Sequence, residues 1–341
     1  MHTFIRRVRK GKTLRTNPFE ALLSILSEDM KKVDELIANR MESDHTPLIP
    51  KITDHLINAG GKRIRPLLTL ASANLFNYSG VKHIALAATV EFIHTATLLH
   101  DDVIDESLQR RGKPTANLLW NNKLAVLVGD FLFSRAFQLM VETNSIEILS
   151  SLANASAQIS ESEVLQMSLA QNLKSTEALY MKVIKGKTAT LFAAACEVGG
   201  LISNASNIQV RALSQYGEAL GISFQIVDDF LDYASTDTKL GKNIGDDFRE
   251  RKVTLPVIRS LQNENENTNA FWYRTIGKGA QTKTDFKVAQ EILMEDGSLN
   301  KTKLEAIRWS EIAKSKLKNL PNSQTKELLT DLTLSVVSRI V

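Results

Sequence analysis

The sequence carries the same acidic motif twice, as DDVID at residues 101–105 and as DDFLD at residues 228–232. Aspartates occupy positions i, i+1 and i+4, so on a helix each motif gathers its carboxylates into one compact patch. Each motif also follows a strongly apolar segment that is typical of a buried helix. Carboxylates grouped in apolar surroundings repel one another and lose hydration unless cations lie between them.

The two motifs predict a metal site that works on phosphates. Clustered carboxylate oxygens are hard ligands, and Mg²⁺ usually reaches a protein through a few carboxylates together with the substrate's phosphates. We therefore expect several Mg²⁺ ions and diphosphate chemistry. The six candidate ligands are Asp101, Asp102, Asp105, Asp228, Asp229 and Asp232.

Cationic segments accompany the acidic motifs. GGKRIRP at residues 60–66 opens a predicted helix, with Lys62 and Arg65 three residues apart beside its positive end. Arg110 and Arg111 follow the first motif, and guanidinium groups match phosphate oxygens with fork geometry. The remaining candidates are Lys187 with Thr188, Lys242 and Lys252. Each cation alone is typical of solvated surface charge, and their joint occurrence indicates a site.

Composition limits the classes of function. The net charge of +4 depends on six basic residues that precede Glu20, the first acidic residue. Without these six, 42 − 6 = 36 basic residues face 38 acidic ones, a net charge of −2. We therefore expect no nucleic-acid partner. No uninterrupted apolar run approaches the roughly 18 residues of a membrane span, so we expect no transmembrane segment.

The chain contains one cysteine, Cys196, which excludes an internal disulfide and indicates a reducing compartment. We expect a cytoplasmic protein with a basic tail over residues 1–17 and one catalytic domain over residues 18–341. The arginine-rich start fits a solvated tail or an organelle transit segment. A transit segment would place the protein in the mitochondrial matrix.

Helical spacing of apolar residues dominates from about Pro18 onward, and no proline occurs between Pro114 and Pro256. Helices are predicted over residues 81–100, 124–141, 146–169, 176–198 and 210–233. The polar stretch 262–269 is predicted to be a surface loop. The expected fold is all-α, a single large helical bundle in which the two acidic motifs face each other across a central cavity.

The order of these segments resembles the trans-isoprenyl diphosphate synthase family. The resemblance is carried by GGKRIRP, EFIHTATLLHDDVID, RRGKPTAN, KT, and FQIVDDFLD followed by GKNIGDD. It covers nearly the whole chain from about Leu22. The flanking segments 127–136 and 163–166 are most similar to the long-chain branch, which makes the octaprenyl to decaprenyl side chain of ubiquinone.

The resemblance implies the isoprenoid synthase fold, a homodimer, and head-to-tail condensation of isopentenyl diphosphate onto an allylic diphosphate such as farnesyl diphosphate. It implies that Mg²⁺ is held against the allylic diphosphate by Asp101, Asp102, Asp105 and Asp228. Asp229 and Asp232 would lie nearby.

The resemblance also implies the roles of the other site residues. Arg110, Lys187 and Lys242 would complete the allylic site, with Thr188 and Gln225 as neutral partners and Lys252 as an electrostatic contributor. The isopentenyl diphosphate would be bound by Lys62, Arg65, His94 and Arg111. His94 precedes Asp101 by seven residues, which is two helical turns on the same face.

One position departs from the family pattern. The family usually has glycine between the residues that correspond to Glu250 and Lys252, whereas this chain has Arg251. If the backbone there has a positive φ, arginine would reduce stability or turn Lys252 away from the site.

Two other functions match parts of the pattern. A class I terpene cyclase also ionises a diphosphate at a DDxxD helix, but it normally has an Asn/Ser/Glu second motif and lacks a second-substrate site. A non-catalytic subunit of a heteromeric synthase would have lost aspartates, and all six are present here.

Product length is predicted from Ala96 and Thr97, which precede Asp101 by roughly 6–8 Å along the helix. Short-chain family members place aromatic residues there, and the small Ala96 is expected to leave the pocket open for a long product. We predict that Ala96→Phe shortens the product, as measured by mass spectrometry of the chain lengths. An unchanged distribution of product chain lengths would refute the interpretation that Ala96 leaves the pocket open.

Overall fold

The computed structural model describes residues 17–43, 45–58, 60–110, 112–234, 244–263 and 265–340. Of the described residues, 77% are helical. Within the described ranges the strand pairing is one short antiparallel hairpin, β1 (Gln109–Arg110) with β2 (Lys113–Pro114). The all-α prediction is confirmed.

The elements before the hairpin are α2 (Pro18–Ile25), α3 (Ser27–Met41), α4 (Leu48–Asn58), α5 (Ile64–Asn74) and α6 (Lys82–Ile104). After it come α7 (Ala116–Trp120), α8 (Asn122–Glu142), α9 (Ile146–Ser168), α10 (Glu177–Ile184), the π-helical turn η1 (Lys185–Ala189), α11 (Thr190–Ile202) and α12 (Asn207–Ala234). The last elements are α13 (Asp246–Arg249), α14 (Leu255–Leu261), α15 (Glu266–Trp272), the π-helical turn η3 (Tyr273–Gly277), α16 (Asp285–Glu295), α17 (Ser298–Lys316) and α18 (Gln324–Ser338).

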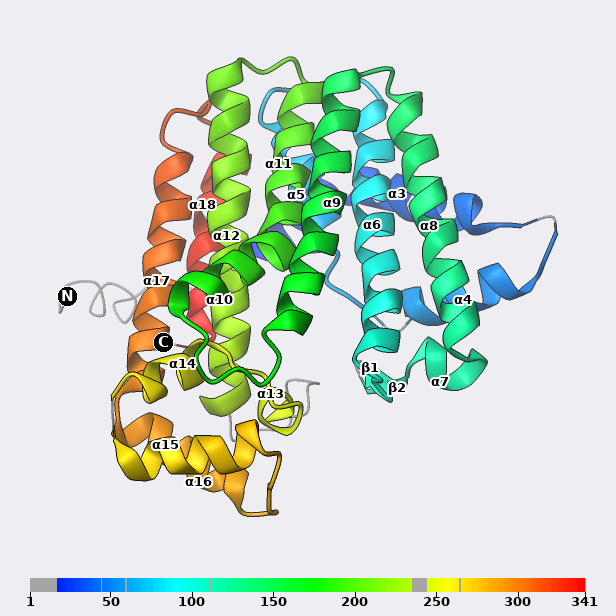
Figure 1. Ribbon diagram of the computed structural model, residues 1–341. Coiled ribbons are helices and arrows are strands. Elements are labelled where there is room, and N and C mark those ends of the chain that lie inside the picture. Colours follow the sequence, from blue (N-terminus) through cyan, green and yellow to red (C-terminus); the bar gives the residue numbers. More distant parts are fainter. Residues whose placement is uncertain are drawn as a thin grey trace.

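The long helices stand side by side in a bundle (Figure 1). α6 packs mainly against α8 and α5, α11 against α12, α5 and α9, and α12 against α17. Their inward faces form one large apolar core, in which Phe92, Phe192 and Tyr216 are among the largest fully buried side chains. Because α6 and α12 each carry an acidic motif in their last two turns, the bundle determines where both motifs lie.

Local signals explain most of the helix boundaries. The side chains of Asn121, Ser145 and Thr176 accept hydrogen bonds from backbone N–H groups in the first turns of α8, α9 and α10. The helix predicted over residues 176–198 is present as α10, η1 and α11 in succession, with the π-helical turn η1 inside it. The helix predicted over residues 81–100 continues through Ile104, so the first acidic motif lies within it.

The surface loop predicted over residues 262–269 is correct at residues 262, 263 and 265, which are exposed and non-helical, but wrong from Glu266 onward. The side chain of Asn265 accepts a hydrogen bond from the N–H of Thr268, and α15 begins at Glu266. Asparagine is common both in loops and at helix N-caps. Here the apolar residues at the end of α15 favour the helix. Trp272 is fully buried in a second, smaller apolar cluster, and its indole N–H donates to Ser260.

Helix α8 has an unusual surface. Among the described helices it is the one long and apolar enough to cross a membrane by length and composition, and 39% of its most apolar window is buried. Leu127, Phe137 and Val141 on α8 are 62%, 45% and 61% exposed. An apolar stripe of this length is typical of a surface that contacts another molecule.

Candidate active site

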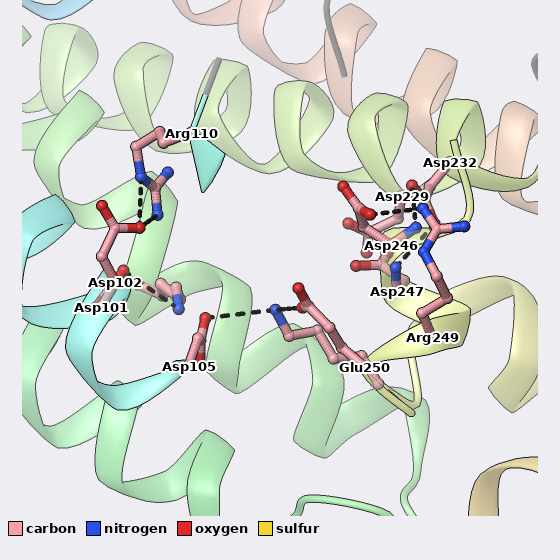
Figure 2. A network of polar contacts seen from close by, with 12 residues as sticks. Asp101, Asp102, Asp105, Arg110, Asp229, Asp232, Asp246, Asp247, Arg249 and Glu250 are labelled. Carbon is pink, nitrogen blue, oxygen red and sulfur yellow. Dashed lines mark hydrogen bonds and ion pairs between the residues drawn. The ribbon is translucent and has the colours of Figure 1, made fainter. Parts of the chain in front are cut away.

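Both acidic motifs lie at the C-terminal ends of their helices. Asp101 and Asp102 are in the last turn of α6, and Asp105 is its C-cap, with its N–H donating to the carbonyl of Asp101 (2.8 Å). The second motif lies in the last two turns of α12, and the two groups occupy opposite sides of Figure 2. A helix C-terminus carries partial negative charge, so the helices themselves add to the repulsion among the carboxylates.

Arg110, on the hairpin strand β1, is the cation nearest to Asp102. Its Nε and Nη2 atoms lie 2.8 Å and 2.7 Å from Oδ1 of Asp102 (Figure 2). Asp102 is buried, and among the described residues its Oδ2 atom has no hydrogen-bond partner. Burial raises the pKa of Asp102, although Arg110 opposes the shift. The second oxygen is therefore a buried acceptor that is available to a ligand.

Lys187 links the first motif to α9. Its Nζ atom lies 2.8 Å from Glu163 and 3.6 Å from Asp101. Burial raises the pKa of both Asp101 and Glu163, and Lys187 opposes the rise. The close packing of α9 against η1 depends on Gly186, because a Cβ atom there would collide with Ser162, the neighbour of Glu163. Glu163 was not among the site residues predicted from the sequence.

Lys252 is the cation that contacts Asp105. Its Nζ atom lies 3.5 Å from Asp105 and 2.5 Å from Glu250, which face each other in Figure 2. Burial by itself would lower the pKa of Lys252, but Asp105 and Glu250 outweigh it and the pKa is raised. Lys252 therefore stays charged and joins the end of α6 to the segment after α13.

Tyr180 and Gln225 both donate hydrogen bonds to Asp229 in the second motif. Its Oδ2 accepts from the hydroxyl of Tyr180 (2.6 Å), and its Oδ1 accepts from the side-chain amide of Gln225 (2.8 Å). Gln225 in turn accepts from the hydroxyl of Thr188 in η1 (2.8 Å). Both Asp229 oxygens thus already have protein donors, which favours a supporting role. Nothing in the local sequence around Tyr180 indicated this contact.

Asp232 caps a helix. Its carboxylate accepts from the backbone N–H groups of Gly245 (3.1 Å), Asp246 (3.2 Å) and Asp247 (3.0 Å), at the start of α13. Burial raises the pKa of Asp232, and these amides oppose the rise. A carboxylate is favourable at the positive N-terminus of a helix, so Asp232 fixes α13 against α12.

Asp228 contacts a residue near the end of the chain. The Nη1 atom of Arg339, the C-cap of α18, lies 3.3 Å from Oδ1 of Asp228. Arg339 could not be predicted as a site residue, because the two residues are 111 positions apart and no local spacing connects them. Asp228 therefore pairs with a cation from α18.

A pocket of about 110 Å³ lies beside the first motif. Its lining includes Gly60, Gly61, His94, Asp102 and Arg110. The structure therefore brings the GGKRIRP segment, His94 and the arginine hairpin together around one cavity. These are the segments expected to bind the second substrate.

The remaining predicted residues differ in position. Lys62 is exposed immediately before α5, and the guanidinium of Arg65 stacks on the Phe192 ring, 4.7 Å from its centroid. Ala96 is fully buried in the large core, and the hydroxyl of Thr97 donates to the carbonyl of His94. Arg111 and Lys242 lie outside the described residues. The ligand and substrate roles of all these side chains stay predictions.

The residues present fit a hard divalent cation. The available donors are carboxylate oxygens, and one of them is the buried Oδ2 of Asp102. Within the described part of the chain, no three His, Cys, Asp or Glu side chains converge closely enough to hold an ion unaided. This is the arrangement expected when water and substrate phosphates complete the coordination of Mg²⁺.

Comparison with known proteins decides the family. The profile of the polyprenyl synthetase family matches residues 46–293. An octaprenyl diphosphate synthase from Haemophilus influenzae is 39% identical over 320 residues, which cover 94% of this chain and 97% of that protein. The chain belongs to the polyprenyl synthetase family. The resemblance stated from the sequence motifs is confirmed.

Solved structures of this family agree with the fold. A decaprenyl diphosphate synthase from Rhodobacter capsulatus superposes with a TM-score of 0.92 at 55% identity, covering 95% of this chain and 99% of that chain. A polyprenyl synthase from Caulobacter crescentus, solved with calcium and isoprenyl diphosphate, gives a TM-score of 0.91 at 45% identity and covers 96% and 100% of the two chains.

We predict that Tyr180→Phe lowers both stability and activity. The change leaves a buried carboxylate oxygen of Asp229 without its donor, which costs about 1–3 kcal/mol and loosens the neighbouring Asp228. Chemical unfolding and steady-state kinetics measure the two effects. Tyr216→Phe is the matched control, because its buried hydroxyl donates to the carbonyl of Leu329 instead of an acidic motif. Normal turnover in Tyr180→Phe would contradict the supporting role of Asp229.

Proposed function

We propose that this polyprenyl synthetase is an all-trans long-chain polyprenyl diphosphate synthase. It condenses isopentenyl diphosphate head-to-tail onto an allylic diphosphate primer such as farnesyl diphosphate, in a reaction that requires Mg²⁺. The observation that carries the proposal is the pairing of two acidic motifs at helix ends with a separate pocket next to the first of them. The octaprenyl and decaprenyl synthases among its relatives support a long product.

The allylic diphosphate would bind between the motifs. Asp101, Asp102, Asp105 and Asp228 would hold Mg²⁺, which neutralises the diphosphate and polarises its bond to the allylic carbon. Arg110, Lys187 and Lys252 already contact the first motif through its carboxylates. They surround the position that a diphosphate would occupy, and Lys242 would join them from the preceding segment.

Isopentenyl diphosphate would bind on the other side of Arg110. The pocket lined by Gly60, Gly61 and His94 lies there, next to the cationic start of α5. Lys62 and Arg65, with Arg111 from the hairpin turn, would hold its diphosphate. The wall that carries His94 continues along α6 to Asp101, so both substrates contact one rigid helix.

The arrangement suits an ionisation followed by an addition. The allylic carbon–oxygen bond breaks, and its electron pair leaves with the diphosphate, whose growing negative charge the fixed cations stabilise better than water can. The double bond of isopentenyl diphosphate then attacks the allylic carbocation. Loss of a proton gives the new trans double bond, and the released diphosphate is the expected proton acceptor.

The competing functions fit less well. A terpene cyclase needs no second diphosphate site, whereas here a pocket lies beside the first motif, where we propose that the second diphosphate binds. A non-catalytic subunit needs no complete aspartate set, whereas Asp101, Asp102 and Asp105 remain together with three cations around them.

We further propose that residues 18–341 act as one catalytic domain in a homodimer. The interface would use the apolar stripe of α8; on α9, Val164 and Met167 are also apolar and 68% and 59% exposed. A twofold interface buries the same patch on both subunits, as a self-complementary stripe allows. We place the enzyme in the cytoplasm and its product in the ubiquinone side chain. The mitochondrial alternative depends on residues 1–16, which lie outside the described residues.

We predict that purified protein elongates farnesyl diphosphate with isopentenyl diphosphate and Mg²⁺ to octaprenyl–decaprenyl products. Activity should disappear with EDTA and return with Mg²⁺. Asp101→Asn and Asp228→Asn should each reduce kcat by at least about 100-fold, since each removes charge from the stabilising site. Glu147→Gln is the control, because Glu147 lies in the first turn of α9, at the opposite end of that helix from Glu163. A cyclic hydrocarbon, or no elongation by the wild type, would exclude the proposed function.

We predict that Leu127→Arg converts the dimer into monomers, because it places two like charges within an apolar twofold interface. Sedimentation velocity measures the change. Ile208→Arg is the control, since Ile208 is 76% exposed on a different helix. A monomeric wild type, or a dimeric Leu127→Arg variant, would contradict the interface.

A further inference from the structure

The turn that positions Lys252 has a geometry that favours glycine. After α13, the N–H of Lys252 donates to the carbonyl of Asp247 (2.8 Å), and the N–H of Arg251 donates to the carbonyl of Phe248 (3.1 Å). This pair of bonds defines a Schellman motif, in which the residue after the C-cap is left-handed. Arg251 occupies that position with φ of 60°. A side chain is disfavoured there, so something must hold Arg251 in place.

The side chain of Arg251 makes the compensating contacts. Its Nε donates to the carbonyl of Ile276 (2.7 Å), and its Nη2 donates to the carbonyl of Gly277 (2.6 Å). These carbonyls end η3, where backbone acceptors lack helical partners and attract cations. The guanidinium lies against Gly279, where a Cβ atom would be 2.9 Å from Nη1. Arg251 thus attaches the turn to η3, which packs in the second, smaller apolar cluster.

The next residue along the chain reaches the site. Lys252 contacts Glu250 and, at 3.5 Å, Asp105 at the end of α6. The same segment is held at its other end, because Asp232 accepts from three N–H groups at the start of α13. With both ends fixed, the backbone leaves Lys252 little freedom to move away from Asp105. A glycine in place of Arg251 would permit the turn but would not anchor it.

We propose that Arg251 is a positioning residue for Lys252. By anchoring the turn to η3, it holds the Lys252 ammonium at the edge of the first acidic motif, where the leaving diphosphate would develop its charge. This inference rests on the proposed function for the identity of the leaving group. The anchor itself is a property of the fold and can be tested separately.

Two substitutions separate positioning from strain. Arg251→Gly and Arg251→Ala both remove the guanidinium, but glycine relieves the left-handed backbone while alanine keeps it strained. Positioning predicts that both variants lower kcat about tenfold, with the KM for isopentenyl diphosphate within about twofold of the wild type. Thermal unfolding should rank glycine above alanine. Turnover that follows this stability ranking, or normal kcat in both variants, would overturn the proposal.

A double-mutant cycle tests whether the effect passes through Lys252. Lys252→Met should lower kcat by itself, and adding Arg251→Gly should then change kcat by less than about twofold. Full additivity of the two losses would overturn the proposal. Arg274→Ala is the matched control, because Arg274 pairs with Asp285 at the same apolar cluster and has no described contact with residues 244–254. An equal kcat loss in Arg274→Ala would assign the effect to general destabilisation.

Hydrogen exchange gives a readout that needs no activity. In Arg251→Gly the amides of Lys252 and Val253 should exchange faster than in the wild type, whereas Arg274→Ala should leave them unchanged. Unchanged exchange in Arg251→Gly would refute the anchor, whatever reaction the enzyme catalyses. Absence of elongation by the wild type would refute the proposed function and leave the exchange experiment as the test of the anchor.

Discussion

The arrangement of the site depends on one electrostatic conflict: its carboxylates lie at the C-terminal ends of helices, and the partial negative charge of those ends repels them. α6 and α12 both end in aspartates, at the termini where the helix dipole is negative. Cations stabilise the C-terminus of a helix, so the acidic motifs add negative charge where it is least favourable. The positive charge that stabilises them must come from other parts of the chain and from bound ions. The hairpin, the π-helical turn η1 and the segment after α13 each contribute one such cation.

The two motifs meet this constraint in different ways. Around the first motif the partners are the cations Arg110, Lys187 and Lys252, whose charges would also act on a bound diphosphate. In the second motif, Asp229 and Asp232 are satisfied by a phenol, an amide side chain and backbone N–H groups. These neutral donors fix the backbone without supplying charge. Identical spacing in the sequence therefore corresponds to different partners: three cations around the first motif, and in the second a cation on Asp228 beside neutral donors to Asp229 and Asp232.

Much of this could be predicted from sequence, because it depends on local spacing. Helical periodicity predicted the all-α fold, and the eight residues between Asp102 and Arg110 kept that arginine within reach of the first motif, although the hairpin itself was not predicted. The contacts of Tyr180 and Arg339 could not be found in this way, because they depend on how α10 and α18 pack against α12. The stretch 262–269 was misjudged because asparagine is common in loops and in helix caps alike. The positive φ considered for Arg251 is present, but its anchor on η3 belongs to tertiary structure.

The π-helical turn η1 has a consequence for how this chain can vary in length. A π-helical turn holds one residue more than an α-helical turn. Deleting one residue within Lys185–Ala189 would restore ordinary helical hydrogen bonding, so the helix alone would tolerate it. The deletion would, however, remove or shift side chains that η1 directs at its neighbours, namely Lys187 toward Glu163 and Thr188 toward Gln225. The contacts of Lys187 and Thr188, and not helix stability, therefore require the extra residue in this turn.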